Sequence, residues 1–208
     1  MKKLLVFCLF CWGLYLLWQS WETRSATLDL EGSGYKLTYS VVWGMSMHER
    51  LSVARAEQPF SGSSSEWLEL YKKPYNSGLA VYRTLDGSAY YFGFLYRTIR
   101  FDPASGTLKA LCEKPAEVGY TDEGARLAQM KDVVLSQQAD AGAPRLFDHI
   151  DGDWLAASTG KPVASKYYAN LQYLGRFGIL DGGLRGTDVG FLPAARPEPH
   201  LALNAGCG

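Results

Sequence analysis

The sequence predicts an α+β, β-dominated fold in which an antiparallel meander sheet with one packed helix follows an N-terminal hydrophobic membrane-insertion helix. Three observations lead to this prediction: an uncharged apolar run near the start, period-two alternation with tight-turn sequences over about residues 35–112, and one helical apolar stripe over 121–138. We expect a signal anchor or signal peptide at 1–21, a short stalk at 22–34, and a single extracytoplasmic domain at 35–208.

The N-terminal segment has the composition of a membrane-insertion signal. Residues 4–18 carry no charge and directly follow Lys2 and Lys3. Extending the run to residue 21 gives about the length of a short membrane span, with Trp residues at its outer end. Because positive charge stays on the cytoplasmic side, we expect a single-pass inner-membrane protein with a cytoplasmic N-terminus and a periplasmic domain.

Cleavage of the leader is the alternative to anchoring. Signal peptidase needs small residues at the last and third-last positions, and the nearest candidate, ending at Ala26, has Arg24 at the third-last position. An uncleaved anchor is therefore favoured, while cleavage would leave a secreted or periplasmic domain.

Strands are predicted where Tyr, Val, Thr and aromatic residues alternate with polar ones. The predicted strands are 27–30, 35–43, 66–72, 79–85 and 88–101, and the Ser-rich run 59–65 is expected to be a flexible loop. Asp86-Gly87 predicts a two-residue hairpin turn, and the sequence from Asp102 to Gly106 predicts another turn. Consecutive strands joined by such turns form a meander.

One helix is predicted over 121–138, where acidic residues after Thr121 suit the positive end of the helix dipole. Its apolar stripe is expected to pack on the sheet. Further on, glycines interrupt the chain, with short strands predicted at about 171–180 and 189–192. Residues 193–199 contain three prolines and are expected to form an extended tail.

Charge and cysteine content limit the partners. The chain has 21 basic and 21 acidic residues and no clustered Lys or Arg, so nucleic acid is not expected as a partner. Cys8 and Cys11 lie in the leader, which leaves Cys112 and Cys207 for the exported domain. In an oxidising compartment these two are expected to form a disulfide, with two unpaired thiols as the alternative.

An acidic cluster is the one candidate metal site. Asp148, Asp151 and Asp153 lie close in sequence, and their carboxylates are ligands that a hard cation such as Ca²⁺ takes. Their spacing does not match an EF-hand loop, so an Asp- and Gly-rich surface turn is the alternative. Three scattered histidines, His48, His149 and His200, do not have zinc-site spacing, and His48 and His200 are expected at the surface. No cofactor is expected.

Motifs for covalent catalysis are weak. Ser158 and Lys161 have S-x-x-K spacing, but the Lys-Thr-Gly element that accompanies this motif in penicillin-binding enzymes is absent. No phosphate-binding loop and no Gly-x-Ser-x-Gly sequence is present. An enzymatic role is therefore not favoured.

Aromatic residues in the predicted strands are the candidate binding residues. On one exposed sheet face they would stack against sugar rings or a peptide, although alternation places about half of them in the core. The candidates are Trp67, Tyr71, Tyr82, Tyr90, Phe92 and Tyr96.

The function we expect is that of a non-catalytic, membrane-tethered extracytoplasmic binding or accessory domain. Its partners would be the inner membrane, through residues 4–21, and a protein or glycan outside the cytoplasm. The alternative is an extracytoplasmic hydrolase that uses the Asp148 to Asp153 cluster with His149, with or without a divalent cation.

Overall fold

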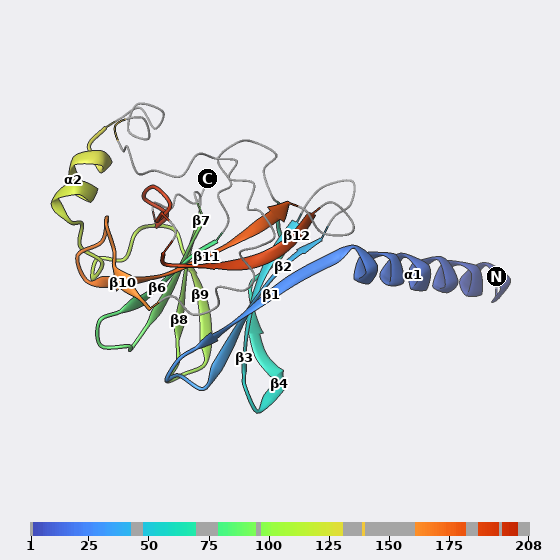
Figure 1. Ribbon diagram of the computed structural model, residues 1–208. Coiled ribbons are helices and arrows are strands. Elements are labelled where there is room, and N and C mark those ends of the chain that lie inside the picture. Colours follow the sequence, from blue (N-terminus) through green and yellow to red (C-terminus); the bar gives the residue numbers. More distant parts are fainter. Residues whose placement is uncertain are drawn as a thin grey trace.

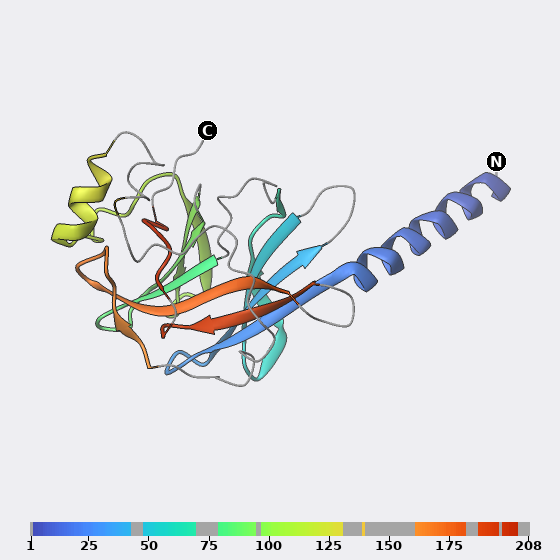
Figure 2. The same cartoon turned by 45° about the horizontal axis from the view of Figure 1, so that its top comes forward.

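The computed structural model describes residues 2–42, 48–69, 79–94, 97–130, 139, 161–181, 187–195 and 197–203. In these ranges the protein is β-dominated, with antiparallel sheets and the two helices α1 and α2, as expected for an α+β fold. Helix α1 (Lys2–Glu22) projects away from the strands in both ribbon views (Figures 1 and 2). Within the part of the chain that is described, no helix combines the length and hydropathy needed to cross a membrane.

Two sheets form where one meander was expected. Sheet A has the order β1-β2-β3-β4, with β5 also paired to β3, and sheet B has the order β10-β11-β6-β7-β8-β9, with β12 paired to β11. The strands of sheet A are β1 (Thr23–Leu30), β2 (Tyr35–Val42), β3 (His48–Arg55), β4 (Gln58–Ser64) and β5 (Leu68–Glu69). Those of sheet B are β6 (Leu79–Thr84), β7 (Tyr90–Phe94), β8 (Arg97–Asp102), β9 (Thr107–Leu111), β10 (Val163–Ala164), β11 (Leu171–Asp181) and β12 (Thr187–Pro193).

The N-terminal sheet differs from expectation in two places. The strand expected at 27–30 within a stalk begins earlier, because β1 runs from Thr23 and pairs with β2 over its whole length, from Thr23 opposite Val42 to Leu30 opposite Tyr35. The Ser-rich run expected to be a loop is largely strand β4, because small and hydroxylated side chains do not prevent main-chain pairing with β3.

The hairpins of sheet B agree more closely with expectation. Strands β6 to β9 form consecutive antiparallel pairs, although the single strand expected over 88–101 is two strands, β7 and β8. The turn at Asp86 is longer than two residues, and the Asp86 carboxylate accepts a hydrogen bond of 3.0 Å from Ser88 N. At the β8–β9 turn Gly106 has a φ of 68°, which glycine adopts without steric cost.

One apolar core lies between the two sheets. It combines inward side chains of sheet A with those of β6, β7, β8, β11 and β12. The largest of them are Tyr39, Tyr90, Phe92, Phe101 and Phe177, all no more than 1% exposed. Burial of apolar surface therefore holds the two sheets together, and each Å² of it contributes roughly 25 cal/mol of stabilising free energy.

A second core covers the opposite face of sheet B. It contains Tyr82, Tyr91 and Tyr173 from the sheet, Leu127 from α2 (Asp122–Ala128), and Leu203 from the C-terminal segment. A bulge between Tyr173 and Gly175 makes this possible, because it reverses the facing of β11 partway along the strand. Among the described residues, sheet B is thus covered on both faces and sheet A on one.

Helix α2 begins where the sequence predicts. Thr121 is the N-cap, and its Oγ1 accepts a hydrogen bond of 3.1 Å from Gly124 N. The helix ends at Ala128 within the described residues, and 131–138, the remainder of the predicted helix, lie outside them. The expected extended tail is instead packed, since Glu198 and His200 are each 8% exposed, and the surface position expected for His200 is wrong.

Candidate binding surface

The aromatic residues expected to form an exposed platform are mostly buried. Tyr82, Tyr90 and Phe92 are no more than 1% exposed, because both faces of sheet B are covered and both halves of its alternating pattern face a core. These three rings are therefore not available for stacking as they lie. Trp67 is 42% exposed, whereas Tyr71 and Tyr96 lie outside the described residues.

The acidic cluster lies outside the described residues. This applies to Asp148, Asp151 and Asp153, and also to His149. Among the residues that are described, no group of three or more His, Cys, Asp or Glu side chains is placed to hold a metal ion.

The structure describes three of the four cysteines. Cys112 is disulfide-bonded, and Cys8 and Cys11 are free and exposed. Cys207, the partner we predict for Cys112, is outside the described residues.

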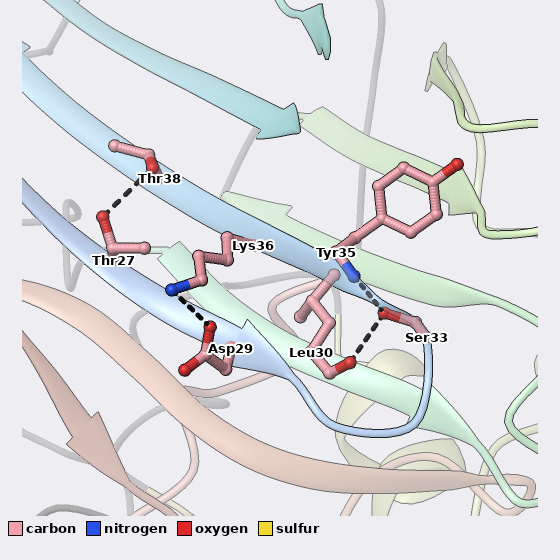
Figure 3. A network of polar contacts seen from close by, with 7 residues as sticks. All are labelled: Thr27, Asp29, Leu30, Ser33, Tyr35, Lys36 and Thr38. Carbon is pink, nitrogen blue, oxygen red and sulfur yellow. Dashed lines mark hydrogen bonds and ion pairs between the residues drawn. The ribbon is translucent and has the colours of Figure 1, made fainter. Parts of the chain in front are cut away.

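The face of sheet A that no described segment covers carries a row of hydroxyl side chains across four strands. Thr27, Thr38, Ser52 and Ser64 occupy paired positions on β1, β2, β3 and β4. The Thr27 and Thr38 hydroxyls are 3.1 Å apart and hydrogen-bonded, as Figure 3 shows. Adjacent strands are about 4.8 Å apart, so the hydroxyl row extends for roughly 14 Å.

Charged side chains lie next to the hydroxyl row, two residues further along β1 and β2 toward the turn that joins them. The Lys36 ammonium is 3.4 Å from the Asp29 carboxylate, beside the Thr27 and Thr38 pair in Figure 3. On the opposite side of β2, the Arg55 guanidinium lies 5.9 Å from the centroid of the Tyr35 ring, which packs against Phe101 of sheet B, and donates to the Tyr35 hydroxyl over 3.3 Å. The Lys36–Asp29 pair is exposed and contributes little to stability, so Lys36 is available to a ligand.

A depression of about 380 Å³ lies beside Lys36 and the hydroxyl row. The small residues Ala54, Ala56 and Gly62 are among the residues that line it. No acidic residue is among its lining residues in the described part of the chain. The depression thus presents hydrogen-bond donors and positive charge.

Trp67 lies at the other end of the same face. The Arg50 guanidinium is 5.5 Å from the centroid of the indole ring, at a distance typical of a cation–π contact. Arg50 also donates to Ser64 Oγ over 2.5 Å, which connects Trp67 to the hydroxyl row. Depression, hydroxyl row and Trp67 therefore form one continuous surface, which we call the outer face of sheet A.

Two buried carboxylates were not singled out by the sequence. Glu49 is 4% exposed and accepts a hydrogen bond of 2.6 Å from the Tyr39 hydroxyl, and burial raises its pKa to about 7. Glu198 accepts bonds of 2.6 Å from Ser165 Oγ and Lys166 N, and burial raises its pKa as well. Perturbed pKa values occur at active sites, but both of these carboxylates are enclosed by protein.

The hydroxyl row on the outer face of sheet A has a sequence signal of its own. Hydroxyl residues recur with period two at Ser25 and Thr27 and again at Thr38 and Ser40. Because the strand expected within the 22–34 stalk covered only 27–30, Ser25 was not included in this pattern.

Comparison with protein-family models, with curated proteins and with solved structures finds no match to this chain.

Proposed function

We propose that this protein is a non-catalytic binding domain, held at the extracytoplasmic face of a membrane by α1, and that it binds through the outer face of sheet A. The observation that carries the binding role is the continuous surface of hydroxyls, cations and one exposed Trp on the only sheet face that no described element covers. Such a surface offers several weak, directional contacts, which suits recognition of a polar ligand.

The membrane role is supported by the surface of α1. Twelve large apolar side chains between residues 4 and 18 are at least 45% exposed, and they face all sides of the helix. A water-soluble helix buries such residues against a core, whereas a lipid-facing helix exposes them. Strand β1 begins at Thr23, directly after α1 ends at Glu22, so the tether would hold the domain close to the bilayer.

A non-catalytic role is supported by the neighbours of the exposed hydroxyls. Nucleophilic catalysis by Ser or Thr needs a base within hydrogen-bonding reach. Thr27 and Thr38 bond to each other, and Ser64 accepts from Arg50, which is a cation and not a base. The outer face therefore offers contacts for binding without an activated nucleophile among its described residues.

Topology is tested by thiol labelling of intact cells with a membrane-impermeant reagent. Thr27→Cys, on the outer face of sheet A, should be labelled from outside, and Lys3→Cys, before the apolar run, should be labelled only after lysis. The full chain should sediment with membranes, and removal of residues 2–22 should release it. Labelling of Lys3→Cys but not Thr27→Cys in intact cells would refute the proposed orientation, and a mature chain lacking α1 would replace the anchor with a cleaved signal.

Catalysis is tested separately. The purified full chain in detergent should leave ester, peptide and glycosidic test substrates unchanged. Turnover that exceeds a mock preparation would contradict the non-catalytic role and favour the hydrolase alternative.

A further inference from the structure

The outer face of sheet A has the chemistry of a site for an acidic sugar. We propose that it binds an acidic oligosaccharide, with carboxylate, sulfate or phosphate groups in the depression lined by Lys36 and a sugar ring against Trp67. This inference rests on the proposed binding function and specifies the ligand class for the same surface.

Charge complementarity argues for an anion in the depression. Lys36 is among the residues that line it, and no acidic residue is among its described lining. Asp29, the one carboxylate ion-paired with Lys36, has a side chain 71% exposed, so solvent screens it strongly. An anionic group in the depression would displace Asp29 from Lys36 and form a charge-assisted hydrogen bond with the ammonium.

The hydroxyl row argues for a polyhydroxylated ligand. Thr27, Thr38, Ser52 and Ser64 are each both donor and acceptor, as sugar hydroxyls are. The row crosses three spacings of about 4.8 Å between four strands and is roughly 14 Å long. This length exceeds the width of one sugar ring and fits a short chain. A simple inorganic anion would use the depression only and leave the row unused.

Trp67 supplies an apolar contact at the far end of the row. One side of its indole lies near the Arg50 guanidinium at 5.5 Å, and the side chain remains 42% exposed. Large, rigid aromatic side chains that present one apolar face and a polar edge are enriched in binding sites. Because Arg50 also bonds Ser64, the indole is fixed relative to the hydroxyls.

The surface is also accessible when α1 is in a membrane. Lys36 pairs with Asp29, six residues along β1 from Thr23, where α1 ends. At about 3.4 Å per residue this places the depression roughly 20 Å from the helix end. Ligands outside the membrane would reach it without moving the domain.

Titration calorimetry on the full chain in detergent tests the proposal. The probes are oligogalacturonate for carboxylate, a chondroitin sulfate oligosaccharide for sulfate, a glycerol phosphate oligomer carrying sugars for phosphate, a neutral cello-oligosaccharide, inorganic sulfate, and single-stranded DNA. We expect at least one acidic oligosaccharide to bind at least tenfold more tightly than the neutral one and than inorganic sulfate.

Matched variants assign the site. Lys36→Glu should weaken binding of the acidic probe at least tenfold, whereas Lys109→Glu, an exposed lysine on β9, should change it less than twofold. Trp67→Ala should weaken binding at least fivefold, with Trp67→Phe between it and the parent. Unfolding curves should be unchanged for Lys36→Glu, because its ion pair with Asp29 is exposed.

Several outcomes would overturn the proposal: no binding of any acidic oligosaccharide, equal binding of the neutral probe, tighter binding of single-stranded DNA, or no effect of Lys36→Glu. Failure of the ligand class can be told apart from failure of the proposed function. Absence of sugar binding with Thr27→Cys still labelled from outside rejects only the sugar, whereas binding followed by cleavage of the probe rejects the non-catalytic role.

Discussion

The Tyr39 hydroxyl donates a hydrogen bond of 2.6 Å to Glu49 Oε2 between neighbouring strands of sheet A, on the side that faces sheet B. Both residues are buried, with Tyr39 1% and Glu49 4% exposed. Burial raises the pKa of Glu49 to about 7, and the bond from Tyr39 offsets part of that rise. The pair is thus a titrating group inside the core.

Glu49 should make the protein less stable as pH rises. Between its ordinary pKa of 4.5 and the folded value of about 7, the folded chain keeps a proton that the unfolded chain has lost. Stability therefore falls over this interval, by roughly 3 kcal/mol once the pH exceeds 7, at about 1.4 kcal/mol per pKa unit. Glu49→Gln should remove this loss, so urea unfolding should give similar stabilities for both proteins at pH 4.5 and a more stable variant at pH 8.

Two controls accompany this measurement. Glu113→Gln, at an exposed position, should leave the pH dependence unchanged. Tyr39→Phe should move the fall to higher pH, because it removes the bond that lowers the pKa of Glu49. The pKa of Glu198 is also raised by burial, so Glu198 should contribute to the dependence of stability on pH that remains in Glu49→Gln. Identical slopes for the parent and Glu49→Gln would show that Glu49 does not titrate in this range.

Local structure could largely be predicted from the sequence, whereas the assignment of strands to sheets could not. The Asp102 to Gly106 turn, the strand β11 and the Thr121 N-cap each depend on residues close together in the chain. The alternation of β2 and of β6 is the same whether they share a sheet or face each other across a core. The meander was therefore predicted as one sheet, and two are present.

The site was harder to predict, because exposure depends on what covers a sheet. Tyr82 and Phe92 point to opposite faces of sheet B, and both are buried, since sheet A covers one face and α2 with the C-terminal segment covers the other. Burial of Glu198 likewise depends on contacts with Ser165 and Lys166, more than 30 residues away. Such long-range packing has no local sequence signal.

The C-terminal segment should be sensitive to any side chain at Gly93. A Cβ at this position of β7 would lie 2.5 Å from the carbonyl oxygen of Ala202, well inside normal contact distance. Gly93→Ala should destabilise the protein by about 1–3 kcal/mol through overpacking and should displace the segment. Urea unfolding and limited proteolysis near residue 203 would measure both effects.

Gly119→Ala is the matched control for this prediction. A Cβ there would lie 3.6 Å from Ala169 Cβ, which is an ordinary contact. If both variants lost the same stability, the close approach of Ala202 would not be the cause.

Ser165 should help to hold the C-terminal segment in place. Its hydroxyl donates to Glu198 Oε1 over 2.6 Å and accepts from the backbone N–H groups of Tyr167 and Tyr168 at 3.2 and 3.0 Å. Ser165→Ala leaves these buried groups short of a partner, which should cost about 1–3 kcal/mol of unfolding free energy. Ser105→Ala, in an exposed turn, should cost less than about 0.5 kcal/mol, and equal losses would argue against the network.

Cys112 should join the end of the sheet B meander to the C-terminal tail. It is disulfide-bonded, and we predict Cys207 as its partner, so a peptide map under non-reducing conditions should recover the two together. A loop of about 95 residues closed in this way stabilises by about 4–5 kcal/mol in the chain-entropy model. Cys112→Ser should lower the free energy of unfolding by up to that amount and should remove its dependence on added reductant.

Replacement of Cys8 and Cys11, which are free, should change neither quantity. Recovery of Cys112 linked to Cys8 or Cys11, or as a free thiol, would contradict the predicted bridge.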